Sequence, residues 1–143
     1  MYTHYNIALL VAAGSSALAA LLHVAVIIGG TSWYRFFGAG DRMVRASMAG
    51  KLYPAVVTSG IVLVLAAWSA YALSGAGVLP ALPLLKVGLV VITAVYLLRG
   101  AVLFPVLLMS GVQARTFGIW SSAICLLFGL FHLAGVVQVW SRL

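Results

Sequence analysis

Four long apolar segments, joined by short polar connections, make up most of this sequence. They occupy about residues 7–29, 55–74, 84–104 and 117–140. Each is close to the roughly 20 residues that an α-helix needs to cross the hydrocarbon core of a bilayer. Helices satisfy their own backbone hydrogen bonds in lipid, whereas a few isolated strands could not. The pattern predicts an all-α, polytopic integral membrane protein with four transmembrane helices in an antiparallel bundle, and residues 1–143 as a single domain.

The composition excludes a soluble fold. Hydrophobic residues are 65% of the 143 residues, and charged residues are 6%. A soluble domain carries about a quarter charged residues, and a chain of this size keeps much of its surface in contact with its solvent. That solvent must therefore be lipid. No basic residue precedes the first segment, which is long enough to span, so we expect a retained helix rather than a cleaved signal peptide.

The distribution of positive charge predicts an orientation in the membrane. Eight Lys and Arg residues face a single acid, Asp41. They are sparse and flank the apolar segments, which points to anionic lipid rather than nucleic acid as a partner. The first connection carries Arg35, Arg42, Arg45 and Lys51, and the third carries Arg115, with Arg99 just inside the membrane on the same side. Because Lys86 and Arg142 alone lie on the other side, the positive-inside rule predicts that both termini are non-cytoplasmic.

The first connection, residues 31–53, mixes aromatic and basic residues. Asp41 is a candidate N-cap for a short helix from Arg42 to about Ala49. We predict an amphipathic interfacial segment that holds the loop against anionic headgroups. Its membrane-surface residues are Arg35, Arg42, Arg45 and Lys51. The alternative is a gate or docking surface over the mouth of a cavity.

Ionisable side chains inside the spans are the first functional candidates, because burying them in lipid is costly. Three qualify: His23, Arg99 and His132. The rise of a helix places His23 and Arg99 at about the same depth, roughly 9 Å from the cytoplasmic edge, and His132 apart from them near the outer side. The sequence thus predicts a polar cluster in the cytoplasmic half of the bundle, with His132 as a secondary candidate: His23, Tyr53, Thr58, Ser59, Tyr96 and Arg99.

The predicted cluster holds a guanidinium but no carboxylate, so an anionic guest would balance its charge. Structural alternatives exist for each ionisable member. Arg99 could extend its head group to the membrane surface. His23 and His132 could each make a hydrogen bond between helices and do nothing further. We hold these alternatives open beside the functional interpretation.

Several kinds of catalytic and cofactor site are disfavoured. One acid cannot form a carboxylate pair. Cys125 and His132 are seven residues apart, which is not a short metal-binding spacing. A haem held between His23 and His132 would need both imidazoles on one iron, and the expected depth difference of roughly 9 Å argues against it. We predict no metal and no cofactor.

These considerations predict a small membrane protein that transports or binds a small anionic or amphiphilic molecule. The alternative is an accessory subunit of a larger membrane complex that binds lipid or quinone. A histidine-dependent membrane enzyme is the least favoured interpretation, because carboxylates and an evident nucleophile are lacking. Stripes of small residues, such as Ala12, Ser16 and Ala20, favour close helix contacts and association into a homo-oligomer or a complex.

Overall fold

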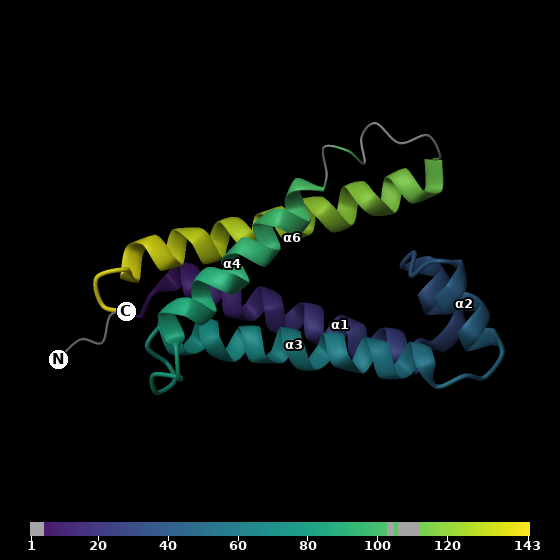
Figure 1. Ribbon diagram of the computed structural model, residues 1–143, viewed down its shortest axis with the longest axis horizontal. Helices are drawn as coiled ribbons and strands as arrows, with labels where there is room; N and C mark the ends of the chain where they lie inside the picture. The colour runs from purple at the N-terminus through teal and green to yellow at the C-terminus, as the bar shows by residue number, and fades with distance from the viewer. Residues whose placement is uncertain (1–4, 103–104, 106–111) are drawn as a thin grey trace. The chain divides into compact units, whose positions relative to one another are not determined.

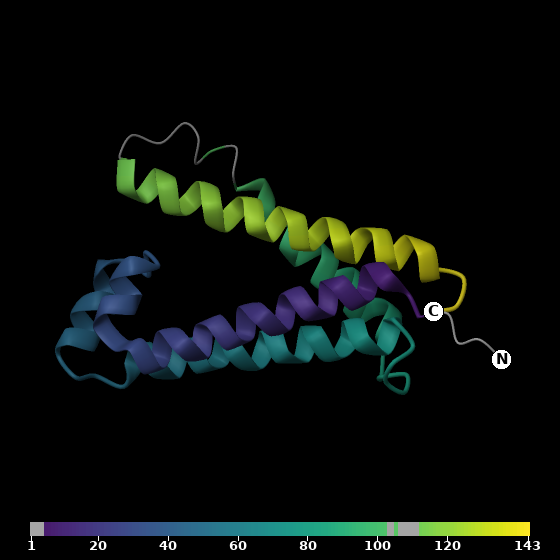
Figure 2. The same cartoon turned by 180° about the vertical axis from the view of Figure 1, so that it is seen from behind.

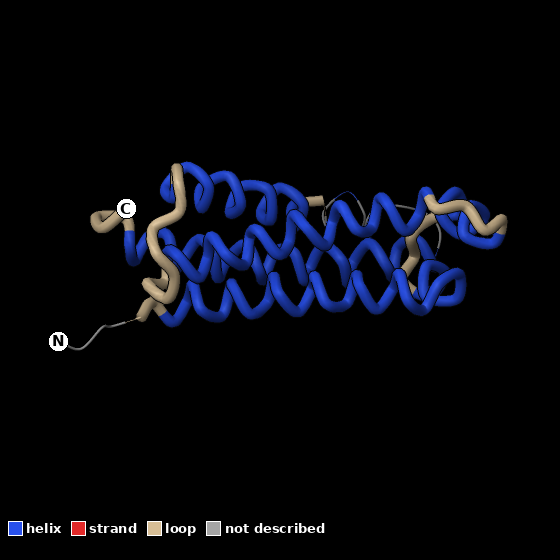
Figure 3. Tube along the Cα trace, turned by 90° about the horizontal axis from the view of Figure 1, so that it is seen from below, coloured by secondary structure: helices blue, strands red, loops and turns tan. Residues whose placement is uncertain are grey.

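The computed structural model describes residues 5–102, 105 and 112–143, and every regular element in these ranges is an α-helix (Figure 1, Figure 3). The all-α prediction is therefore confirmed for the described residues. The helices, in chain order, are α1 (Ile7–Phe36), α2 (Asp41–Met48), α3 (Tyr53–Gly75), α4 (Leu85–Ala101) and α6 (Val112–Val139).

Three helices are long and apolar enough to cross a membrane: α1, α3 and the Gly118–Val139 part of α6. They indicate a multi-pass membrane protein. The helix α4 has 17 residues, a length of about 25 Å, which is slightly short of the usual span. The predicted end of this segment at Phe104 lies outside the described residues. The fourth span and the antiparallel bundle as a whole stay predictions.

The first connection differs from the prediction at one point and adds a helical stretch. The first apolar segment was predicted to end at the Gly29-Gly30 pair, and Gly30 is non-helical, with a φ of 63° and a ψ of −145° that suit glycine alone. After this kink helical structure resumes and α1 extends to Phe36. The N-cap of α2 is Gly40, without a side-chain cap hydrogen bond, and Asp41 is the first helical residue. There the carboxylate still interacts favourably with the helix dipole. The start of α3 matches the prediction, with Pro54 in its first turn.

The helices form two compact units, and α1 and α3 contribute a part to each. The first unit contains residues 1–16 and 67–143, and the second contains residues 17–66. In the first unit α4 packs side by side with α6 (Figure 1). Glycines make this contact close: a Cβ at Gly100 would lie 2.7 Å from the Cα of Leu126, and one at Gly129 would lie 3.0 Å from the backbone nitrogen of Leu97.

The start of α1 completes the first unit and lies along the C-terminal part of α6 (Figure 2). Gly135 of α6 allows Leu9 to approach, since a Cβ there would lie 3.1 Å from the Leu9 backbone nitrogen. Hydrophobic residues of α1, α4 and α6 then form a buried cluster with Ala76: Leu9, Leu89, Val136 and Val139. The end of α3 is joined to α1 by a hydrogen bond of 2.9 Å from Ser69 Oγ to the carbonyl oxygen of Ala13.

The second unit contains the rest of α1, then α2 and the start of α3. Tyr34 and Thr58 connect α1 with α3 through their hydroxyl groups, which are 3.1 Å apart. Thr31 and Ser47 connect α1 with α2 in the same way, at 2.8 Å. The predicted short helix between the first two apolar segments is thereby confirmed and is tied to α1 by polar contacts.

Candidate ligand-binding site

Arg99 lies in the last turn of α4, and its guanidinium is directed at α6. Its Nη1 donates a hydrogen bond of 3.0 Å to Ser122 Oγ, and its Nη2 donates one of 2.7 Å to Ser121 Oγ. Ser122 is fully buried, while Arg99 and Ser121 are half-buried. Arg99 is therefore held in the contact between two helices, and two neighbouring hydroxyl groups orient it.

The charge of Arg99 meets no acidic side chain in its own unit. The single Asp or Glu of the chain is Asp41, which is exposed in α2 of the second unit. A guanidinium has five N–H donors, and the two serine hydroxyl groups that accept from it can still donate their own hydrogens. An anion at this position could receive hydrogen bonds from the guanidinium and from both hydroxyl groups, with opposite charge adding to each guanidinium bond.

Tyr96 lies one turn before Arg99 on α4 and is buried. Its hydroxyl group is 2.9 Å from Ser16 Oγ on α1. Its ring meets Trp68 edge to face at a centroid distance of 4.8 Å and Phe128 of α6 at 5.7 Å. Tyr96 and Arg99 both contact α6, so the prediction that they share a face of their helix is confirmed.

His132 of α6 is fully buried beside Tyr96, with 5.1 Å between the ring centroids. Its Nδ1 is 2.9 Å from the carbonyl oxygen of Phe128. Among the described residues no group forms a hydrogen bond with its buried Nε2. The sequence predicts that His132 lies apart from Tyr96 and Arg99, near the outer side, whereas the structure places His132 directly beside Tyr96. The helices α4 and α6, which carry the two residues, cross in Figure 2.

The other four predicted cluster residues belong to the second unit. Thr58 is buried and donates a hydrogen bond of 2.8 Å to the carbonyl oxygen of Pro54. Ser59 is exposed, and Tyr53 is 44% exposed. The Nδ1 of His23 is 2.7 Å from the carbonyl oxygen of Ala19. Within this unit Thr58 forms no hydrogen bond with Ser59 or Tyr53, and its hydroxyl group lies 3.1 Å from that of Tyr34. The six-residue cluster therefore stays a prediction.

Ser16, Ser121, Ser122 and Tyr34 contribute hydroxyl groups that the predicted cluster lacked. For Ser16 a signal was present, because it falls on the small-residue stripe expected to face other helices. Ser16 and Ser122 are both fully buried. The pairing of Ser121 and Ser122 with Arg99 could not be read from one sequence, because helical spacing identifies a face and not the neighbour that it meets.

The predicted membrane-surface cations are all exposed in the second unit: Arg35, Arg42, Arg45 and Lys51. Arg42 lies over the ring of Tyr53, with its guanidinium carbon 5.4 Å from the ring centroid. Arg35 reaches Met48 Sδ at 3.7 Å. Next to Arg35, Ser32, Trp33, Phe36 and Phe37 line an open, mostly apolar hollow of about 400 Å³. An interfacial role for this surface fits its exposure and charge, and stays a prediction.

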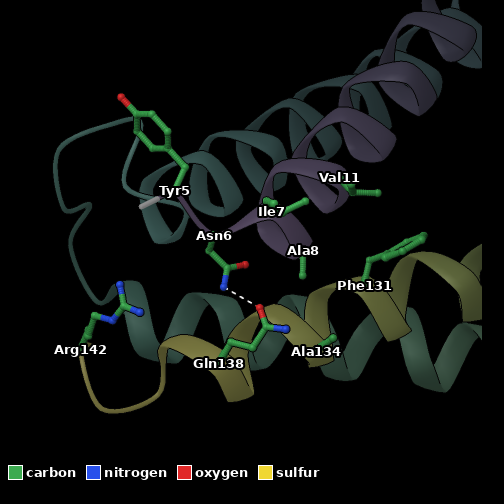
Figure 4. Close-up of a pocket in the computed structure, with 9 residues that line it drawn as sticks. All are labelled: Tyr5, Asn6, Ile7, Ala8, Val11, Phe131, Ala134, Gln138 and Arg142. Carbon is green, nitrogen blue, oxygen red and sulfur yellow. Dashed lines mark hydrogen bonds between the residues drawn. The ribbon is translucent and has the colours of Figure 1, made fainter. Parts of the chain in front are cut away.

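A second open groove, of about 570 Å³, lies between the start of α1 and the end of α6 (Figure 4). Its floor is apolar and includes Ile7, Val11 and Phe131. Across it Asn6 Nδ2 donates a hydrogen bond of 2.8 Å to Gln138 Oε1, and Arg142 lies at one end. This groove contains neither Arg99, Ser121 nor Ser122 and is separate from the Arg99 site.

Within the described part of the chain, no group of three or more His, Cys, Asp or Glu side chains is arranged to hold a metal ion. Comparison with models of protein families, with curated proteins and with solved structures finds no match to this chain.

Proposed function

We propose that this protein binds an anionic amphiphile from the membrane, with the anionic group held by Arg99, Ser121 and Ser122. One observation carries the proposal: a half-buried guanidinium, oriented by two neighbouring hydroxyl groups, has no acidic side chain in its unit. A charge removed from water is costly unless it is paired. An arginine fork matches the geometry of a carboxylate or a phosphate.

The surroundings of Arg99 favour an amphiphile over a small soluble anion. Apolar side chains next to it on α4 are exposed, including Leu98 at 70%. Ile124, a half-turn after Ser122 on α6, is also exposed. In a membrane these surfaces face acyl chains. A molecule whose anionic group reaches Arg99 could therefore lay its apolar part against both helices.

Native mass spectrometry of the purified protein with dioleoylphosphatidylglycerol, oleate or dioleoylphosphatidylethanolamine tests the proposal. We expect the two anionic probes to be retained more strongly than the zwitterionic one. Comparison of phosphatidylglycerol with oleate then distinguishes a phosphate from a carboxylate. In Arg99→Gln we expect both anionic probes to bind at least about tenfold more weakly, because their hydrogen bonds to the charged guanidinium are lost.

Lys86→Gln is the matched control, since it removes one positive charge from the other end of α4, where Lys86 lies over the ring of Trp140 at 4.0 Å. We expect it to bind as the unsubstituted protein does. Unchanged retention in Arg99→Gln would contradict the proposal. Loss of retention in Arg142→Gln instead would place the amphiphile in the groove of Figure 4. Transport of the bound molecule, also predicted from the sequence, requires flux measurements in liposomes.

A further inference from the structure

The imidazole of His132 has a defined arrangement of its ring hydrogen. Its Nδ1 is 2.9 Å from the carbonyl oxygen of Phe128, four residues earlier on α6. A carbonyl oxygen only accepts hydrogen bonds, so Nδ1 must carry the hydrogen. A second hydrogen on Nε2 would make the ring a cation, which is costly inside an apolar span. The neutral ring therefore presents a lone pair at Nε2.

That lone pair is buried and unpaired among the described residues. His132 has no exposed surface, and Nε2 has no hydrogen-bond partner there. Tyr96, whose ring contacts that of His132, has its hydroxyl group 2.9 Å from Ser16 Oγ. Almost all buried polar atoms in proteins have a partner, so such an atom needs an explanation.

The surroundings define the chemistry of the missing partner. It must donate a hydrogen bond, because Nε2 can only accept one. The Tyr96 ring packs against the His132 ring, and Trp68 and Phe128 meet the Tyr96 ring edge to face. Arg99, one turn from Tyr96 on α4, repels a cation. These conditions favour a neutral hydroxyl group.

We propose that His132 Nε2 is a binding site for a neutral O–H donor, which is either an enclosed water molecule or the hydroxyl group of a membrane-soluble molecule such as a quinol. The site is independent of the anion site at Arg99, because it needs no charge and lies about ten residues further along α6 than Ser122. It gives the protein a second recognition point inside the same helix contact.

Nitrogen-15 NMR of the histidine side chains in lipid nanodiscs tests this proposal. The chain has three histidines, His4, His23 and His132, and His132→Gln assigns the signals of His132 by their loss. We expect the hydrogen on Nδ1 and an Nε2 signal shifted towards that of a hydrogen-bonded acceptor. A hydrogen on Nε2, or an Nε2 signal typical of a free lone pair in every sample, would overturn the proposal.

Added ligands distinguish the two sources of the hydroxyl group. The samples contain no addition, decylubiquinol kept reduced, or the dimethyl ether of the same quinol, which lacks O–H groups. A hydrogen-bonded Nε2 without any addition identifies water. A shift that decylubiquinol produces and its dimethyl ether does not identifies a membrane-soluble hydroxyl compound.

A substitution provides a second, independent readout. His132→Leu removes the lone pair and keeps an apolar side chain of similar size. If Nε2 has a bound donor, the leucine variant loses that bond, and we expect a lower midpoint of thermal unfolding than for His23→Leu. A midpoint equal to or above that of the unsubstituted protein would contradict the proposal, since removing an unpaired buried acceptor is neutral or stabilising.

Discussion

Arg99 and His132 lie on the same helix contact and have opposite hydrogen-bonding needs. Arg99 brings N–H donors and a positive charge to Ser121 and Ser122. His132 presents an acceptor with no charge and no partner among the described residues. Tyr96 lies between them in the packing, and its hydroxyl group is engaged by Ser16. The two residues therefore select different chemical groups, and neither can substitute for the other.

The hydrogen bond of Tyr96 should contribute measurably to stability. Tyr96→Phe removes the hydroxyl group and leaves Ser16 Oγ, which is fully buried, without this partner. We expect the free energy of unfolding to fall by about 0.5–1.5 kcal/mol. Titration of the protein in mixed micelles with a denaturing detergent measures it.

Tyr71→Phe is the control for Tyr96→Phe, because the Tyr71 hydroxyl group donates a hydrogen bond of 3.1 Å to the carbonyl oxygen of Pro83 in an exposed position. An exposed bond is replaced by one to water, so its loss should change stability less. A larger loss in Tyr71→Phe than in Tyr96→Phe would show that the buried layer is not packed as described.

Glycines set how closely α4 and α6 approach. Gly100 of α4 faces the backbone of Leu126, and Gly129 of α6 faces Leu97. Small residues at such positions are the usual basis of helix association in membranes, where the hydrophobic effect does not drive helices together. The close approach also brings Ser121 and Ser122 within reach of Arg99.

Enlarging Gly100 should therefore disturb both stability and the site. In Gly100→Ala the new Cβ would lie 2.7 Å from Leu126 Cα, and the helices must separate. Overpacking of this kind costs about 1–3 kcal/mol. Measurement of the free energy of unfolding of Gly100→Ala in mixed micelles checks this loss of stability. We expect the variant also to retain less phosphatidylglycerol.

Gly14→Ala in α1 is the matched control, since a Cβ there meets nothing within 4 Å. Alanine favours a helix interior over glycine by up to about 1 kcal/mol, so this variant should be as stable as the unsubstituted protein or more so. Equal stability of Gly100→Ala and Gly14→Ala would be incompatible with the described contact between α4 and α6.

Within the first unit, α4 and α6 run in opposite directions. Lys86 near the start of α4 lies over Trp140 after the end of α6, and Arg99 near the end of α4 contacts Ser121. The start of α1 likewise meets the end of α6 through Asn6 and Gln138 (Figure 4). The start of α1 and the end of α6 therefore lie together. The predicted four spans would bring these two positions to the same side of the membrane.

Labelling of introduced cysteines tests this topology. In a Cys125→Ser background, we expect Tyr5→Cys and Arg142→Cys to react with a membrane-impermeant maleimide from the same side of sealed vesicles. Ala49→Cys, after α2, should react from the opposite side. The positive-inside rule predicts that the termini are on the non-cytoplasmic side. Reaction of the two terminal positions from opposite sides would indicate an odd number of crossings.

The sequence predicted much of the fold because length and hydropathy act locally. A run of apolar residues long enough to span a bilayer specifies a helix wherever it packs, so α3 was predicted within two residues of its bounds. The prediction failed at the start of α2, where Gly40 and not Asp41 takes the N-cap position. It also missed the helical stretch that resumes after the kink at Gly30 and extends to Phe36.

The sequence by itself predicted a helical, multi-pass membrane protein, and it determined that no apolar segment holds an acidic side chain to pair with Arg99. The tertiary structure alone decided which groups contact Arg99. Helical spacing places Arg99 and Tyr96 on one face, but the neighbour of that face depends on how α1, α4 and α6 cross. That crossing joins Arg99 to Ser121 and Ser122, and Tyr96 to His132, because contacts between helices are set by packing in three dimensions.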